Sequence, residues 1–151
     1  MMPTAKPPDM HHYQDILVGT DGSDTAARAV EHAVSLADGV DDTVYVLSVA
    51  DAAKNPLMYD VETLDGVEAA VERTATEMQD HAGEATVRGA VREGPPADGL
   101  LSYADEQDVD VIVLGRQGRS GLADEVPGST ADRVVRNADV PVAVVPEAAE
   151  A

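Results

Sequence analysis

The sequence predicts a single α/β domain built on an open five-stranded parallel sheet with helices on both faces. Short β-branched or apolar runs alternate with segments of helical periodicity along the whole chain. The run at residues 109–114 is almost continuously apolar, which is typical of a strand covered by helices on both faces. At 151 residues the chain has the length of one domain. We expect that domain to span residues 1–151, with flexible tails at 1–13 and 147–151.

The first part of the chain predicts two strands separated by a helix. A short buried strand at residues 15–20 leads into a turn at 21–24 that can cap the helix. The β-branched run at 43–49 predicts the second strand. Between the two strands, the inward stripe of the helix consists of apolar residues at helical spacing, namely Ala26, Val30, Ala33, Val34 and Ala37.

The middle of the chain predicts a loop, a long helix and an edge strand. Residues 50–60 contain an Asn-Pro pair and have no clear period, which indicates a loop. A second amphipathic helix is expected over 61–82, broken by Gly83. Residues 86–92 then alternate apolar residues and glycine with threonine and arginine, the pattern of a strand with one solvated face. Such a strand suits the edge of a sheet.

The last part of the chain predicts two further strands, each preceded by a helix. Proline at 95 and 96 can open the third helix, because the missing N–H costs little at the first helical position. The apolar run at 109–114 is expected inside the sheet, and residues 140–145 form the final strand. Ser129 is expected to begin the fourth helix, with Val134, Val135 and Ala138 facing inward.

This alternation predicts right-handed crossovers and the strand order 3-2-1-4-5. Ligands of such sheets lie beyond the carboxyl ends of the strands, at the point where the strand order reverses. Here that point lies between the first and fourth strands. The loops that leave these two strands, residues 20–24 and 115–129, are therefore expected to meet at one crevice.

The loop at 115–129 has the features of a phosphate site. It reads Gly115-Arg-Gln-Gly118, then nine residues, then Gly128-Ser129. Glycine allows positive φ and lets backbone N–H groups approach an anion closely. A helix that opens at Ser129 adds free N–H donors and a favourable dipole. Four of the ten cationic residues fall within or just after this loop, namely Arg116, Arg119, Arg133 and Arg136.

A structural interpretation of the same loop is that its glycines only make turns. In that case Ser129 only caps the fourth helix, backed by Asp132 in the manner of a capping box. The gathering of arginines in an otherwise acidic chain favours the phosphate site.

Composition excludes several classes of partner. The 29 acidic and 10 basic residues give a net charge of -19, so nucleic acid and anionic membranes are poor partners. The chain has no cysteine and no apolar stretch resembling a signal peptide or membrane span, which favours a cytoplasmic protein. The acidity, with only two lysines, indicates a salt-rich cytoplasm and thus a halophile, because salt screens self-repulsion. Ordinary acidic solubility is the alternative.

Motifs for catalysis are scarce. The chain lacks the pattern Gly-x-x-x-x-Gly-Lys-Ser/Thr of P-loop NTPases and the Gly-x-Gly-x-x-Gly dinucleotide fingerprint. Its four histidines are scattered and have no partners at metal-ligand spacing. We therefore assign no catalytic residue.

The glycine pattern of residues 115–129, together with Val-Gly-Thr-Asp-Gly-Ser at residues 18–23, resembles the universal stress protein family over nearly the whole chain. The resemblance implies a Rossmann-like fold of the adenine nucleotide alpha hydrolase type. The spacing matches the family's ATP-binding members, which implies ATP as the ligand, with Mg²⁺. It further implies that Gly115, Gly118, Gly128 and Ser129 hold the phosphates and ribose, with Thr130 close by, and that Thr20, Asp21 and Val49 line the adenine and ribose side.

Some candidate positions have more than one interpretation. Gly19 occupies a position that the family fills with a small residue. Asp21 either contacts the nucleotide or a divalent ion, or only caps the first helix. Asp124 and Glu125 could approach a phosphate-bound metal, or are simply solvated. The candidate nucleotide-binding residues are Gly19, Thr20, Asp21, Val49, Leu114, Gly115, Gly118, Arg119, Gly128, Ser129 and Thr130.

The preferred function is that of an ATP-binding regulatory protein of the stress response. One alternative is an enzyme on the same fold, a slow ATPase or a nucleotidyl-transfer catalyst. Another is an interaction module whose pocket is vestigial. We also expect a homodimer through the final strand at residues 140–145, which carries no charge and lies at an edge that invites another chain. The resemblance implies the same dimer.

Overall fold

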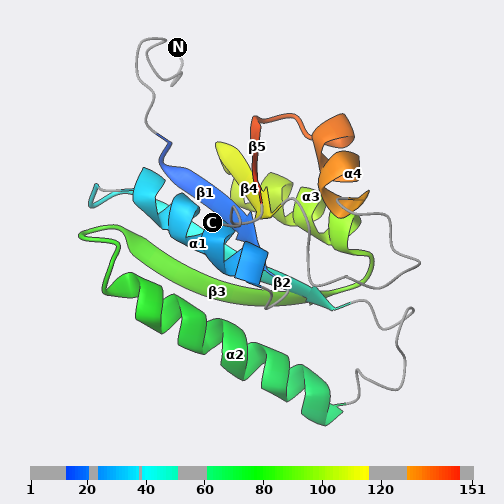
Figure 1. The fold of residues 1–151 in the computed structure, drawn as a ribbon, viewed down its shortest axis with the longest axis horizontal. Coiled ribbons are helices and arrows are strands. Elements are labelled where there is room, and N and C mark those ends of the chain that lie inside the picture. Colours follow the sequence, from blue (N-terminus) through cyan, green and yellow to red (C-terminus); the bar gives the residue numbers. More distant parts are fainter. Residues whose placement is uncertain (1–12, 21–23, 38, 51–60, 116–128, 147–151) are drawn as a thin grey trace, which may run out of the picture.

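The structure is a computed structural model that describes residues 13–20, 24–37, 39–50, 61–115 and 129–146. It contains one sheet of five parallel strands in the order β3-β2-β1-β4-β5, which confirms the predicted architecture (Figure 1). In chain order the elements are β1 (Asp15–Gly19), α1 (Asp24–Leu36), β2 (Thr43–Ala50), α2 (Val61–Gln79), β3 (Thr86–Glu93), α3 (Pro96–Gln107), β4 (Val111–Gly115), α4 (Ser129–Asn137) and β5 (Val142–Val145).

The helices cover the two faces of the sheet in pairs (Figure 1). Helices α1 and α2 pack on one face, where Val34 and Val71 meet the strand residues Val46 and Val113. Helices α3 and α4 pack on the other face, where a second core contains Leu100 and Val134 together with strand leucines and Ile112. The sheet is therefore the middle layer of three.

The inner strands are buried on both faces, as their continuous apolar sequences predict. In β1, Ile16, Leu17 and Val18 are all fully buried, and Ile112 and Val113 of β4 are as well. Successive side chains of a strand point to opposite faces, so only an unbroken apolar run satisfies both cores. Burial of each such side chain stabilises the fold by about 1.5–3 kcal/mol.

Asp110 aligns the starts of β1 and β4. Its carboxylate accepts hydrogen bonds from the backbone N–H groups of Gln14 and Asp15, each at 3.0 Å, and its own N–H donates to the Asp15 carbonyl at 2.7 Å. This clamp accompanies a register in which Ile16 pairs with Val111. Continuing that register brings the carboxyl ends of the two strands to the same level.

The two edges of the sheet differ. On the β3 side, Gln79 at the end of α2 hydrogen-bonds to the outer edge of the strand: its amide nitrogen donates to the Ala85 carbonyl at 2.6 Å, and its amide oxygen accepts the Val87 N–H at 2.9 Å. The exposed Arg88 and Arg92 also lie on this strand, in agreement with the predicted edge position. Within the described part of the chain, no side chain makes a corresponding bond to β5.

Several element boundaries differ from the predictions. Helix α2 ends at Gln79, before Gly83 takes a positive φ of 62°. Strand β4 begins at Val111, since Asp110 is engaged in the clamp on β1. Strand β5 begins at Val142.

The prediction for Val135 was wrong: it is 49% exposed, whereas its neighbour Val134 is fully buried. Successive residues of a helix point about 100° apart, and α4 is rotated so that Val134 faces the sheet while Val135 faces solvent. Ala138, which directly follows α4, is half-buried.

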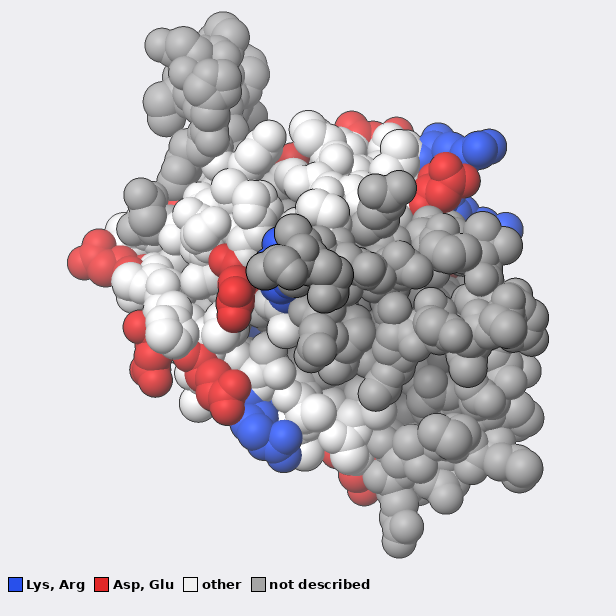
Figure 2. All heavy atoms as spheres, in the orientation of Figure 1, with Lys and Arg blue, Asp and Glu red and all other residues white. Residues whose placement is uncertain are grey.

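Charge is unevenly spread over the surface. On the face shown in Figure 2, acidic side chains lie along α2, and basic and acidic side chains meet at α4. The described helices include none that is both long and apolar enough to cross a membrane.

Candidate functional site

The candidate site lies where the strand order reverses. Strand β1 ends in Gly19 and continues to Thr20, whose N–H donates to the Leu47 carbonyl of β2 at 2.9 Å. The neighbouring strand β4 ends in Leu114 and Gly115. The register of Val18 with Val113 places Leu114 level with Gly19. The structure thus brings four of the predicted site residues together from two distant segments of the chain.

Gly19 is tightly enclosed. A Cβ atom at this position would lie 3.0 Å from the Cδ2 atoms of both Leu100 and Leu114. Few real Cβ contacts are that short, so the packing of α3 and β4 against this strand end favours glycine. Packing against these two leucines thus explains why glycine directly precedes Thr20.

The third strand at the site is β2, which contributes Val49. It is the second-last residue of β2, is half-buried, and packs on the face covered by α3. It lies on the strand next to β1, on the side away from β4. The candidate site, where we expect the crevice, is therefore bordered by the ends of three adjacent strands.

Helix α4 begins at Ser129, as predicted, and follows β4 in the chain. The first N–H groups of a helix have no partner within it, and its dipole is positive at this end. Thr130 is half-buried in the first turn. An anion at this end of α4 would be stabilised by the backbone alone.

Part of the positive charge on α4 is neutralised by an ion pair. The Nε atom of Arg136 lies 3.0 Å from an oxygen of Asp132, one helical turn earlier. Asp132, considered above as a partner of Ser129 in a capping box, is thus engaged with Arg136. Both side chains are more than half exposed, so the pair contributes at most about 0.5 kcal/mol to stability. Arg133 is exposed on the same helix.

The remaining predicted residues lie outside the described ranges. These are Asp21, Gly118, Arg119 and Gly128, together with the metal candidates Asp124 and Glu125. Within the described part of the chain, no three His, Asp or Glu side chains are grouped so that they could hold a metal ion.

Two residues of α3 border the site although the sequence did not predict them there; Leu100 was expected only as part of the buried stripe of this helix. Leu100 packs behind Gly19, and Gly99 lies against Val49, where a Cβ would stand 2.8 Å from a valine methyl carbon. A glycine inside a predicted helix was the available signal, because glycine is unfavourable there. Its partner could be found only from the structure.

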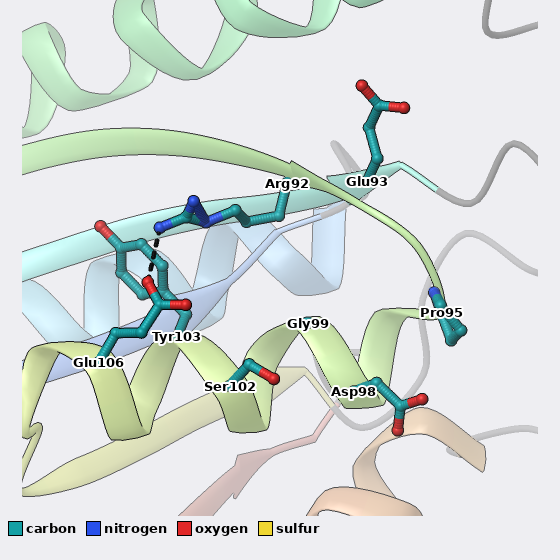
Figure 3. Close-up of a pocket in the computed structure, with 8 residues that line it drawn as sticks. All are labelled: Arg92, Glu93, Pro95, Asp98, Gly99, Ser102, Tyr103 and Glu106. Carbon is teal, nitrogen blue, oxygen red and sulfur yellow. Dashed lines mark hydrogen bonds and ion pairs between the residues drawn. The ribbon is translucent and has the colours of Figure 1, made fainter.

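A groove of about 190 Å³ runs between the end of β3 and α3, beside the crevice (Figure 3). At one end, Arg92 forms an ion pair with Glu106 at 2.9 Å, and its guanidinium carbon lies 4.9 Å from the ring centroid of Tyr103. The Tyr103 ring meets that of Tyr45 edge to face at 5.8 Å. Burial raises the pKa of both tyrosines above the ordinary value. The groove lies on the outer side of β2 from the reversal point, so the crevice is the better candidate site.

Comparison with known proteins identifies the family of this α/β domain. Residues 12–146 match the model of the universal stress protein family. The chain belongs to this family. The universal stress protein MJ0531 of Methanocaldococcus jannaschii is 32% identical over 142 residues, which span 88% of this chain and 82% of that protein.

Solved structures share the whole fold of this universal stress protein domain. The structure of the protein MJ0577 has a TM-score of 0.79 at 25% identity and covers 91% of this chain and 99% of its own. A universal stress protein in complex with cAMP has a TM-score of 0.69 at 26% identity, covering 88% and 97%. The universal stress protein of Archaeoglobus fulgidus in complex with dAMP has a TM-score of 0.65 at 25% identity, covering 88% and 98%. The last two relatives thus bind adenine nucleotides.

Proposed function

We propose that this universal stress protein binds ATP at the carboxyl ends of β1, β2 and β4 and acts as a regulatory protein of the stress response. The observation that carries the proposal is the reversal point itself, where Gly19 and Gly115 end adjacent strands. At Gly115 the missing side chain would allow close approach of a ligand, whereas at Gly19 it makes room for Leu100 and Leu114. Adenine nucleotides bound to two structural relatives support the choice of ligand.

The proposed division of the site follows the two sides of the crevice. Phosphates bind to the loop and helix start after β4, through Gly115, Gly118, Arg119, Gly128, Ser129 and Thr130. The start of α4 supports this assignment, because its free N–H groups and dipole favour an anion. The base and ribose bind on the side of Gly19, Thr20, Asp21, Val49 and Leu114. Mg²⁺ accompanies the triphosphate.

Calorimetric titration with ATP tests the proposal, with cAMP and AMP as comparison ligands. We expect binding by the unmodified protein and its loss in Gly128→Val, because a branched side chain blocks backbone approach to the phosphates. Gly66→Ala is the matched control, since nothing lies within 4 Å of the position where its Cβ would stand. Unchanged affinity in Gly128→Val would exclude the loop as the phosphate site.

A turnover measurement separates this binding protein from the enzyme alternative. A regulatory binder retains ATP, whereas an ATPase or nucleotidyl-transfer enzyme releases product over many cycles. Sustained turnover faster than about one per second would favour the enzyme. Nucleotide that remains bound through purification, identified by mass spectrometry, would exclude a vestigial pocket.

We also propose a homodimer formed through residues 140–145. Strand β5 is an edge strand whose Val144 is 39% exposed, while the opposite edge is engaged by Gln79. Unpaired edge groups beside exposed apolar side chains favour pairing with another chain. A two-fold pair satisfies both copies with one self-complementary contact. The net charge of -19 supports the further proposal that the protein works in a salt-rich cytoplasm, as in a halophile.

A further inference from the structure

Gly99 is the fourth residue of α3, and within a helix alanine is intrinsically more favourable than glycine. A Cβ atom on Gly99 would lie 2.8 Å from Cγ1 and 2.9 Å from Cγ2 of Val49. Real Cβ atoms essentially never approach a neighbour so closely. The other helical glycine with described surroundings, Gly66 in α2, would meet nothing within 4 Å. The space that a side chain at 99 needs is therefore already filled by Val49.

The contact involves both methyl groups of Val49. A valine has a single side-chain torsion, so contact at both methyls leaves little freedom for the side chain. Val49 is half-buried near the carboxyl end of β2, on the face that carries α3. The helix backbone at Gly99 consequently fixes the position of the Val49 side chain.

The same helix supports the neighbouring strand end. Leu100 reaches to 3.0 Å from the position of a Cβ on Gly19. Figure 3 shows Gly99 on α3, in the turn between Pro95 and Tyr103, beside the groove toward β3. The first half of α3 therefore supports the ends of both β1 and β2, whereas the phosphate side of the crevice is formed by β4 and α4.

We infer that Gly99 is a positioning residue for the base and ribose side of the nucleotide site, acting through Val49. This inference rests on the proposed function. A side chain at 99 must displace either Val49 or the start of α3, because interiors are packed without spare volume. Displacement of Val49 changes the β2 side of the site, and displacement of α3 changes it as well because α3 covers that side. Gly99 thus contributes to the choice of base without touching the nucleotide.

The test is a double-mutant cycle on ATP and GTP affinity by titration calorimetry. The variants are Gly99→Ala, Val49→Ala and the double variant, and Gly66→Ala is the matched control. We expect Gly99→Ala to weaken ATP binding about tenfold and to reduce the preference for ATP over GTP. In the Val49→Ala background, where the obstructing methyls are gone, the same change is expected to cost less than about twofold.

The outcomes separate this inference from the proposed function. Gly66→Ala is expected to bind ATP like the unmodified protein. An unmodified protein that binds no nucleotide overturns the proposed function and the role of Gly99 together. Unmodified protein that binds ATP while Gly99→Ala binds equally well overturns the role of Gly99 alone. That role is also overturned if Gly99→Ala weakens ATP and GTP equally, or if its effect is undiminished without the Val49 methyls.

Discussion

The side-chain amide of Gln79 accepts the backbone N–H of Val87 at 2.9 Å, and so occupies an outer position of the edge strand β3. The amide nitrogen simultaneously donates to the Ala85 carbonyl at 2.6 Å. One side chain thus satisfies two groups that a neighbouring strand would otherwise satisfy. Edge strands with unpaired groups promote aggregation, so this contact protects the sheet on the β3 side.

We expect Gln79→Ala to lower the free energy of unfolding by about 1–3 kcal/mol, because two partly buried backbone groups lose their partner. For a domain of this size the melting temperature falls by about 2–4 °C per kcal/mol. Glu77→Ala, an exposed change two residues earlier on the same helix, is the control and leaves stability nearly unchanged. Equal melting temperatures for the two variants would contradict the role of the amide.

Tyr103 makes stability sensitive to alkaline pH. Burial raises its pKa in the folded protein above the ordinary value of 10.0, and Tyr45 and Glu106 act in the same direction, while Arg92 opposes them. A raised folded pKa means that the folded state holds the proton more tightly than the unfolded state. Its stabilising contribution is therefore complete below pH 10 and is lost as the pH rises through the folded pKa.

Tyr103→Phe removes this titration. Among the described residues, the Tyr103 hydroxyl has no hydrogen-bond partner, so the variant should be about as stable as the unmodified protein at pH 7. Urea unfolding between pH 8 and pH 11 is the measurement. We expect the stability of the variant to decline less steeply above pH 10. An equally steep decline would mean that other groups dominate.

Stability should also depend on salt, because the 29 acidic residues repel one another when screening is weak. The Debye length grows from ~3 Å at 1 M to ~30 Å at 0.01 M salt. In α2, the exposed Glu68 and Glu72 stand one turn apart, a spacing at which like charges destabilise a helix. Figure 2 shows acidic side chains along this helix.

We therefore expect the melting temperature to fall when KCl is reduced from molar to millimolar concentration. Glu72→Gln removes one like-charge pair and should raise the free energy of unfolding at low salt by about 0.2–0.5 kcal/mol. The melting temperature of this variant should therefore fall slightly less. A melting temperature that is flat across the salt range would count against both the repulsion argument and a salt-rich cytoplasm.

Local periodicity predicted the elements, and their alternation together with the crossover rule predicted the layers and the order of the strands. The predicted inward stripe of α1 is buried at all its positions, including Val30 and Ala33, because a 3.6-residue repeat defines one face of a helix. The alternation in β3 likewise predicted an edge strand that exposes Arg88 and Arg92. Both patterns depend only on which side chains are apolar and become buried on folding.

Contacts that depend on how two elements meet were not predictable in this way. Val135 is apolar and adjacent to the core, yet the rotation of α4 leaves it exposed. The amide of Gln79 and the packing of Gly99 on Val49 each join residues from different elements at distances that no sequence spacing encodes. For the crevice, the topology rule predicted that the ends of β1 and β4 meet, but not that α3 supports them.

The last prediction concerns the dimer proposed at the β5 edge. Strand β5 carries no charged residue, and Val144 is 39% exposed at the edge of the sheet. Helix α4, which contacts β5, exposes Val135 as well. In a two-fold dimer formed through β5, the interface would bury Val144 of both copies.

Val144→Lys should therefore give a folded monomer. Two lysines that face each other across a two-fold interface would weaken association by about 3 kcal/mol, or roughly a hundredfold, because like charges in an interface repel and lose water. The control is Val40→Lys, since Val40 is 69% exposed in the turn between α1 and β2 and so can carry a charge without cost to the fold. Light scattering on both variants and on the unmodified protein gives the masses.

We expect dimers for the unmodified protein and Val40→Lys, and a monomer with unchanged circular dichroism for Val144→Lys. A monomeric unmodified protein at micromolar concentration would show that the β5 edge does not pair with a second copy.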